Sequence, residues 1–317
     1  MKARQSKHAG SITVAIATRD RPIMVERCLK NLLLQSVLPG EIIVVDQSQD
    51  EETALIVERY KDGPFAVVYD HQLARGLGTG QNRAMTRASA EIVAITDDDC
   101  VPDLNWIKAI EAAFTGPDAV DFVAGPVLPY GPERPDTFPV ATRTSTKRTH
   151  FDCRAMPWEI GSGNNFAVRR VWLERVEGND ERLGPGSPGQ GGVDMDLFYR
   201  LAQAGARIRY EPEVLVFHER ATRESRLARR GPYGYGMGAC CAIWLRQRDY
   251  NSLRVLAHWI SMRAHRLFRG IIQRDRLRVY EELLVFSGTA RGLFYGWRLT
   301  DPRPSQDWAR QPKSSSR

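Results

Sequence analysis

Short runs of isoleucine and valine alternate with helical patterns over the first hundred residues, and this alternation constrains the fold most strongly. Such near-continuous apolar runs are typical of strands that are buried on both faces of a sheet. Because a helical pattern follows each run, the sequence predicts parallel βαβ units and therefore an α/β fold. The predicted strands are residues 12–18, 41–46, 65–70 and 91–96, and the predicted helices are residues 23–35, 52–60 and 81–90.

Polar side chains stand at the carboxyl ends of the predicted strands. Thr18 ends the first strand, Asp46 ends the second, and three consecutive carboxylates follow the fourth, namely Asp97, Asp98 and Asp99. In open parallel sheets the carboxyl ends of the strands share one edge, where ligands bind. We therefore expect these three segments to line one crevice.

Three adjacent carboxylates repel one another, so they indicate a cationic partner. Oxygen ligands suit Mg²⁺ or Mn²⁺, and a cation held by Asp97 and Asp99 would be placed to bridge a diphosphate. The alternative is a solvated turn that caps the following helix, a role for which Asp103 is better placed.

The basic character of the chain is concentrated in its C-terminal third. The formal net charge is +7, whereas residues 220–278 contain 14 arginines, no lysine and 3 acidic residues. Arginine alternates there with large apolar residues at helical spacing. This pattern fits contact with an anionic membrane surface, packing on the rest of the protein or a dimer contact. The region contains no recognised nucleic-acid-binding motif, so we expect no nucleic-acid partner.

Five cysteines, an odd number without a CxxC pair, predict neither a disulfide framework nor a zinc site. The apolar run at residues 12–17 is too short for a signal peptide, and no run reaches 18 apolar residues. We therefore expect a cytoplasmic protein, with the basic helices as its route to the inner face of the membrane.

The order of these segments resembles that of the family 2 glycosyltransferases, which have the GT-A fold. The resemblance covers residues 11–245 and rests on the segments "ITVAIATRDRP", "EIIVVDQS", "RGLGTGQNRAM", "EIVAITDDDC", "GSGNNFAVRR" and "GGVDMDLFYRL". It implies a mostly parallel sheet flanked by helices, with a C-terminal helical extension. It also implies an inverting transferase that moves a sugar from a nucleotide-diphosphate sugar to an acceptor hydroxyl with the help of Mg²⁺ or Mn²⁺.

The resemblance implies a division of the chain into a catalytic domain and a basic extension. The expected parts are an N-terminal tail (1–10), a catalytic domain (11–220) with a nucleotide-binding half (11–103) and an acceptor-side half (104–220), a basic helical extension (221–302) and a disordered tail (303–317).

The resemblance also assigns roles to individual residues. Asp194 matches the general base, although the residue pattern leaves Asp196 and a plain helix-capping role open. The expected nucleotide-sugar contacts are Thr18, Arg19, Asp46, Arg75, Asp97 and Asp98. The expected metal ligands are Asp97, Asp99 and His218. Asn164 and Asn165 are expected at the sugar or acceptor, and Arg229 and Arg230 at the diphosphate, in a segment whose Gly, Tyr and Arg content favours a loop.

The donor nucleotide and the acceptor are less defined. UDP and dTDP are favoured, although Gln47 stands where the family commonly carries Asp or Asn. Lipid-linked and polysaccharide acceptors are the candidates. The "RGLGTG" segment predicts a flexible loop, or a plain turn before a helix at Gln81, because its spacing and place differ from a dinucleotide fingerprint. Two other classes stay open: a nucleotide-sugar-binding protein without transfer activity, and a nucleic-acid binder that uses the Arg-rich third.

Overall fold

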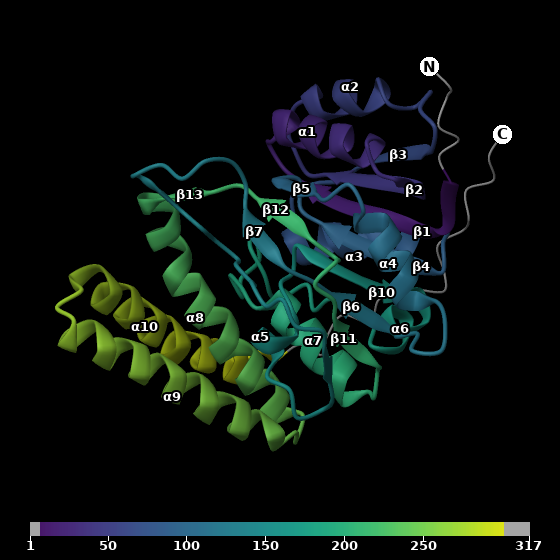
Figure 1. Ribbon diagram of the computed structural model, residues 1–317. Coiled ribbons are helices and arrows are strands. Elements are labelled where there is room, and N and C mark those ends of the chain that lie inside the picture. The colour runs from purple at the N-terminus through teal and green to yellow at the C-terminus, as the bar shows by residue number, and fades with distance from the viewer. Residues whose placement is uncertain (1–6, 301–317) are drawn as a thin grey trace.

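A computed structural model describes residues 7–300, so the expected tail 303–317 lies outside it. Its centre is a sheet of eight strands (Figure 1). In spatial order they are β3 (Ala66–His71), β2 (Val37–Asp46), β1 (Lys7–Thr18), β4 (Ile92–Thr96), β10 (Asn165–Arg169), β6 (Phe122–Ala124), β11 (Ile208–Tyr210) and β9 (Thr149–Phe151). The first four pair in parallel, as predicted, while β10 runs antiparallel to both β4 and β6.

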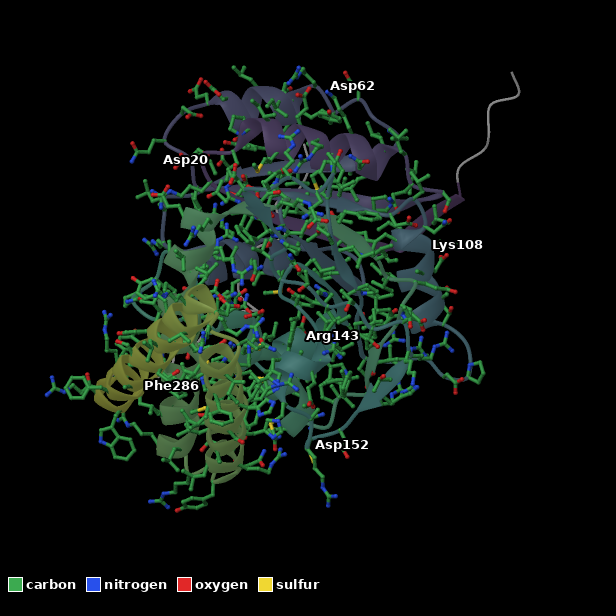
Figure 2. The ribbon with its side chains drawn as sticks, turned by 60° about the vertical axis from the view of Figure 1, so that its left-hand side comes forward. Asp20, Asp62, Lys108, Arg143, Asp152 and Phe286 are labelled. Atoms are coloured by element: carbon green, nitrogen blue, oxygen red, sulfur yellow. The ribbon has the colours of Figure 1, made fainter. Side chains whose placement is uncertain are left out.

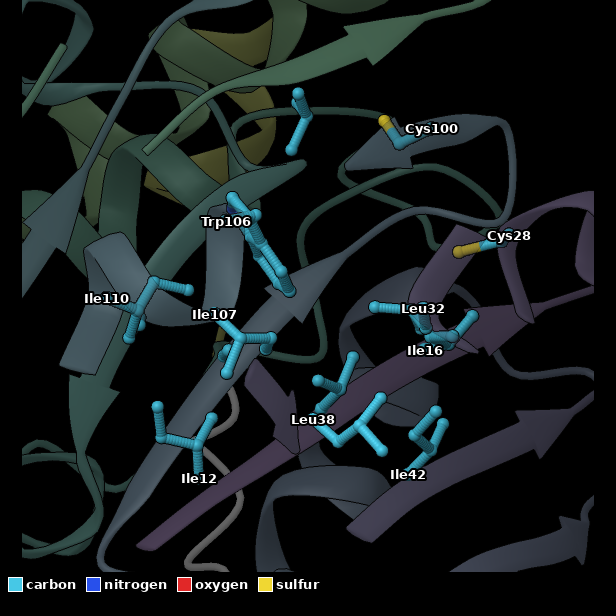
Figure 3. Close-up of a cluster of buried hydrophobic side chains, with 14 of the residues drawn as sticks. Ile12, Ile16, Cys28, Leu32, Leu38, Ile42, Cys100, Trp106, Ile107 and Ile110 are labelled. Atoms are coloured by element: carbon cyan, nitrogen blue, oxygen red, sulfur yellow. The ribbon is translucent and has the colours of Figure 1, made fainter. Parts of the chain in front are cut away.

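Helices cover both faces of this sheet, which confirms the predicted α/β class. On one face lie α1 (Pro22–Leu33), α2 (Glu52–Glu58) and α4 (Trp106–Phe114), and on the other lie α3 (Leu77–Arg87), α5 (Pro157–Ile160), α6 (Arg170–Arg175) and α7 (Val193–Gln203). Figure 3 shows the core of the first face, where Ile16 and Ile42 of the sheet lie near Leu32 of α1 and Trp106 begins α4. Burial of each such side chain contributes about 1.5–3 kcal/mol to the stability of the fold. Because helices cover both faces of the sheet, its strands are stabilised from both sides.

The third predicted helix starts earlier than expected. We expected it at Gln81, but α3 begins at Leu77, so the prediction of a flexible loop for "RGLGTG" is wrong over its last four residues. The cause is close packing. A Cβ added to Gly80 would lie 2.6 Å from the side-chain nitrogen of Gln47, so the glycine here makes room for a neighbour.

A second, three-stranded sheet stands beside the carboxyl ends of the main strands. It consists of β5 (Cys100–Pro102), β12 (Val216–His218) and β7 (Val127–Pro129). Strand β12 pairs antiparallel with β5, and His218 is the register partner of Cys100. This pairing brings the end of β12 next to the three aspartates. Two further strands, β8 (Thr137–Phe138) and β13 (Ala221–Thr222), form a short pair.

Three long helices form the C-terminal extension, apart from the sheet in Figure 1. They are α8 (Arg223–Arg246), α9 (Asn251–Ile272) and α10 (Arg276–Arg298). The expectation of a loop over residues 226–245 is therefore wrong, because this segment is part of α8. Its glycines let α8 and α10 meet backbone to backbone. A Cβ would collide with a carbonyl oxygen of the other helix at Gly234, Gly238, Gly288, Gly292 and Gly296.

The cysteines and the helices agree with two expectations from composition. All five cysteines are free, and four of them are buried. Between residues 7 and 300, no helix combines the length and the apolar character needed to cross a membrane.

Candidate active site

The aspartates after β4 face the end of β1, as the convergence of strand ends predicts. The hydroxyl of Thr18 donates a hydrogen bond to Oδ2 of Asp98 over 2.6 Å. The guanidinium of Arg21, the residue directly before α1, lies 3.1 Å from one oxygen of Asp98 and 3.1 Å from one oxygen of Asp99. An arginine of the same chain thus neutralises part of the negative charge. Arg21 was not among the predicted site residues, although it stands in the "RDRP" segment where the first strand ends.

A second group joins Asp99 to the small sheet. Nε2 of His218 lies 3.3 Å from Oδ1 of Asp99, and this buried oxygen has no hydrogen-bond partner among residues 7–300. Nδ1 of His218 donates to the carbonyl oxygen of Glu219 over 2.6 Å, which leaves Nε2 directed at the carboxylate. A ring nitrogen and a carboxylate oxygen placed in this way can ligate one cation together.

These atoms fit a hard divalent cation. Neighbouring ligands of an octahedral Mg²⁺ or Mn²⁺ lie about 3 Å apart, which suits the Asp99–His218 pair. The sulfur of Cys100 lies in the same group, but burial raises its pKa well above the ordinary value and keeps it a neutral thiol. Among the described residues, Asp97 is not part of this group, although it was expected as a ligand.

Asp97 and Asp194 are close enough for their charges to interact. Loss of solvation is the largest cause that raises the pKa of each, yet both side chains stay partly accessible. The charges of Asp99 and Asp98, and to a smaller extent that of Asp194, raise the pKa of Asp97 further. The predicted base therefore shares one site with the aspartates after β4.

The start of α7 holds Asp194 in place. The helix begins after Gly192, whose φ of 81° suits glycine, and Asp194 lies in its first turn. The amide of Gly163 donates to Oδ2 of Asp194 over 3.0 Å. Asp194 is therefore not the N-cap of this helix, and one of its oxygens is anchored while the side chain remains partly accessible.

Asp196, the competing candidate for the base, has a different surrounding. It is 2% exposed, accepts a hydrogen bond from Nε1 of Trp244 over 2.9 Å and pairs with Arg200 at 2.7 Å. These contacts tie α7 to α8 and keep the carboxylate buried. Of the two aspartates, only Asp194 stays partly accessible.

Asp46 and its neighbour have structural partners. Asp46 is fully buried and accepts hydrogen bonds from Ser48 and from the hydroxyl of Tyr69. Oε1 of Gln47 accepts from the amides of Arg75 and Gly76, and its Nε2 donates to the carbonyl of Gly76. Gln47 thus fixes the chain that leads into α3. Gln47 stands where the family commonly carries Asp or Asn near the nucleotide base. Its side chain sets the position of this loop.

The two predicted arginines of the donor side are surface residues. Arg19 is exposed and pairs with Asp20 at 3.2 Å, at the loop after β1. Arg75 is exposed, and its amide is held by Gln47. Both side chains lie at the carboxyl edge of the sheet, so their predicted contact with the nucleotide sugar stays a prediction.

The two predicted asparagines differ. The amide of Asn165 is fully buried and bonded to Trp106 and to the carbonyls of Pro126 and Val214. It therefore links β10 to its surroundings and has no free group for a sugar. Asn164 is also buried, but its side-chain oxygen has no hydrogen-bond partner among residues 7–300, so it can still accept one.

Arg229 and Arg230 lie on α8, not on a loop. Arg230 pairs with the buried Glu281 of α10 at 3.1 Å. The side chain of Arg229 makes no hydrogen bond or ion pair within the described part of the chain, and its charge acts on the hydroxyl of Tyr233. The charge of Asp194 acts on Tyr233 as well, a residue that was not among the predicted site residues. The arginines and Asp194 thus influence the same hydroxyl.

Comparison with known proteins agrees with this architecture. A family model described as "Glycosyl transferase family 2" matches residues 13–176, and the chain belongs to this family. Two solved structures share the GT-A fold. They are the mannosyltransferase PcManGT from Pyrobaculum calidifontis in complex with GDP-Man and Mn²⁺ (TM-score 0.60, 17% identity, 90% of this chain and 87% of that one) and S. aureus TarS 1-349 in complex with UDP-GlcNAc (TM-score 0.58, 16% identity, 79% and 71%).

Two curated relatives are longer than this chain and are about one quarter identical to it over the aligned residues. The pre-mycofactocin glycosyltransferase of Mycobacterium tuberculosis is 26% identical over 262 residues, which cover 79% of this chain and 52% of the relative. The validoxylamine A glucosyltransferase of Streptomyces hygroscopicus subsp. limoneus is 25% identical over 228 residues, or 63% and 49%. The chain thus spans about half the length of these relatives.

Proposed function

We propose that the protein is a metal-dependent, inverting glycosyltransferase that uses a nucleotide-diphosphate sugar. The observation that carries this proposal is that the charge of Asp194 acts on Asp97, with the Asp99–His218 pair two residues further along the same turn. One side offers an anchored carboxylate that can take a proton, and the other offers ligands for a cation. A binding protein without transfer activity would not need the first of these.

Asp194 is the general base of the proposed reaction. As the acceptor oxygen forms its bond to the anomeric carbon, its proton passes to a carboxylate oxygen of Asp194. The bond from that carbon to the diphosphate oxygen breaks, and the nucleoside diphosphate leaves with the electron pair. A bound Mg²⁺ or Mn²⁺ would neutralise the charge that develops on this leaving group. Attack and departure on opposite faces of the carbon invert its configuration.

The donor side is built from the carboxyl ends of β1, β2 and β4. Thr18 holds Asp98 over 2.6 Å, and Arg21 spans Asp98 and Asp99, so these side chains are ordered before a ligand binds. We propose Asp99 and His218 as cation ligands, with Asp97 completing the shell through water or directly. UDP and dTDP are the favoured nucleotides. The similar structures bind UDP-GlcNAc and GDP-Man, so GDP belongs in the same test.

We propose residues 11–220 as the catalytic domain and residues 221–302 as a basic extension that lies on an anionic bilayer. Figure 2 shows Phe286 of α10 on the side of the molecule opposite Lys108 of α4. Large apolar side chains are exposed along α10, namely Tyr280, Leu283, Phe294 and Trp297. Helix α9 contains no acidic residue, and the two glutamates of α10 are buried. The exposed face is therefore aromatic and cationic, which complements anionic headgroups.

Thermal-shift measurements with UDP, dTDP and GDP, each with Mn²⁺ or with EDTA, test the donor proposal. We expect one nucleotide to stabilise the protein, and only when the cation is present. Asp99→Asn should lose this effect, and Asp62→Asn, at an exposed position, should keep it. Folded protein that responds to none of the nucleotides would contradict the proposal.

A further inference from the structure

Arginines from α8 and α9 form a cluster that buried glutamates neutralise only in part. Arg226 and Arg230 both pair with Glu281, while Arg263 and Arg266 both pair with Glu282. Four guanidinium groups thus meet two carboxylates, both of which are 2% exposed. The side chain of Arg263, 9% exposed, shares its glutamate with Arg266, so an anion bound here would offset positive charge that is held away from water.

Arg263 is the least satisfied member of the cluster. It is 8% exposed, and its contact with Glu282 is long, at 3.5 Å. Its Nε has no hydrogen-bond partner among the described residues, and the same holds for Nε of Arg230. The guanidinium of Arg263 also stacks over the ring of Trp259 at 4.0 Å, which holds its plane in one orientation. Loss of solvation lowers its pKa to about 10, and the charges of Arg266 and Arg230 lower it as well.

The cluster opens toward the proposed base through Tyr233. Tyr233 is 47% exposed, and its backbone follows Pro232, whose carbonyl oxygen would lie 2.6 Å from a Cβ added to Gly191, shortly before Asp194. The charges of Asp194, Arg229, Arg230 and Arg263 all act on its hydroxyl. The contact of Pro232 and Gly236 with Gly191 and Gly192 therefore places Tyr233 and the arginines around it beside the turn that carries Asp194.

We propose that Arg229, Arg230, Arg263 and Tyr233 form a phosphate subsite for the acceptor. The subsite holds a phosphate group of the acceptor while a hydroxyl of the same molecule meets Asp194. This inference rests on the proposed function, because it assigns the acceptor side of the same site. It replaces the expectation that Arg229 and Arg230 bind the donor's diphosphate.

Binding of matched neutral and phosphorylated probes tests the subsite. Octyl glucoside and octyl glucosyl phosphate differ by one phosphodiester, and methyl glucoside and glucose 1-phosphate form a second pair without a lipid chain, in which the phosphate is a monoester. Affinities are measured by calorimetry with Mn²⁺ and a saturating amount of the nucleotide that stabilises the protein, so that the donor site is filled. We expect each phosphorylated probe to bind about 10- to 100-fold more tightly than its neutral partner, the range for charge-assisted hydrogen bonds.

Three variants show where the preference resides. Arg263→Gln should reduce the preference for phosphate at least about tenfold. Arg229→Gln should reduce it in the same direction, and because Arg229 has no structural partner within the described chain, this variant remains informative if Arg263→Gln does not fold. Arg269→Gln, at an exposed position of α9, is the matched control and should keep the preference.

The results separate the two proposals. Equal affinity for neutral and phosphorylated probes, or an unchanged preference in both Arg229→Gln and Arg263→Gln, overturns the subsite. Competition between glucose 1-phosphate and the nucleotide overturns it too, since the arginines would then belong to the donor. A preference for octyl glucosyl phosphate alone supports the subsite and identifies a lipid-linked source, whereas a preference in both pairs supports it for free phosphates as well. Failure of every nucleotide to bind contradicts the proposed function instead.

Discussion

Nε2 of His218 lies 3.3 Å from Oδ1 of Asp99, although 118 intervening residues separate them in the sequence, because β12 pairs with β5. If this pair binds a cation, His218→Ala should weaken Mn²⁺ affinity at least about tenfold, since it removes one ligand. The measurement is a titration of Mn²⁺ against the melting temperature at fixed nucleotide. His150→Ala, at an exposed position of β9 on the far edge of the main sheet, is the control and should leave the titration unchanged. Equal Mn²⁺ affinity in both variants would argue against the cation site.

Asp194→Asn should separate catalysis from stability. The variant keeps an oxygen for the amide of Gly163 but cannot take a proton, so we expect the transfer rate to fall about 10²- to 10⁴-fold while nucleotide binding is retained. Transfer by the wild-type protein should increase as the pH rises through the raised pKa of Asp194, because only the ionised form is a base.

The same pKa predicts the stability of this variant. A carboxyl group whose pKa is raised by folding destabilises the folded state as the pH rises from its unfolded pKa through its folded pKa. Asp194→Asn removes this loss, so the variant should unfold at a higher urea concentration than wild type at neutral pH, and the difference should shrink near pH 4. A stability difference between the two proteins that does not change with pH would show that folding does not raise the pKa of Asp194.

Gln47→Ala should loosen the start of α3. It leaves the amides of Arg75 and Gly76 without their acceptor, at a cost of about 1–2 kcal/mol in the free energy of unfolding. Donor affinity should fall as well, because the loop borders the carboxyl edge of the sheet. Urea denaturation measures the first effect, with Gln203→Ala, an exposed glutamine that makes one hydrogen bond, as the control. Equal losses in the two variants would contradict the role of Gln47.

Much of the fold was predictable because its signals are local. The parallel strands β1 to β4 are runs of Ile and Val, and their shared edge follows from the βαβ pattern, so the approach of Thr18 to the aspartates could be expected. The partners of Arg21 and Gln47 could not, since they depend on the angle at which one loop leaves a strand. Asn165 was misplaced because an asparagine between glycines and a strand looks the same whether it faces a ligand or the core.

The extension was predicted as helical but with a loop at its start, and glycine explains the error. Gly and Pro ordinarily indicate turns. In α8, glycines at positions 234 and 238 instead meet the carbonyls of α10, a contact that depends on a partner more than 40 residues away in the sequence. The four-residue spacing of the glycines on each helix was the one hint in the sequence. It indicates a contact between helices only when both helices are considered together.

Gly292→Ala should destabilise this helix pair. The added methyl group would collide with the carbonyl of Tyr235, a backbone atom that cannot turn aside as a side chain does. We expect a loss of about 1–3 kcal/mol, the cost of overpacking, measured by thermal or urea unfolding. Ser287→Ala, on the exposed face of the same helix, should change stability by less than about 0.5 kcal/mol. Similar values for both variants would mean that α8 and α10 do not touch through their backbones.

The exposed face of α10 should bind anionic vesicles. We expect sedimentation with vesicles of phosphatidylglycerol and phosphatidylcholine, and little with phosphatidylcholine alone, because arginine and aromatic side chains act together there. Phe294→Ser with Trp297→Ser should reduce binding several-fold, whereas Leu34→Ser, at an exposed position after α1, should not. Binding that is equal for both lipid mixtures, or unaffected by the double variant, would contradict a membrane role for this face.

The backbone contact between α8 and α10 also limits how the molecule can move. Two helices separated by side chains can shift by changing rotamers, but helices in contact through glycines have no such layer to rearrange. The pair therefore has little room to shift without a change in its backbone. Gly236 of α8 rests against Gly191 and Gly192, which directly precede α7 and its first turn with Asp194. The outer helices and the proposed base thus rest on the same backbone contact.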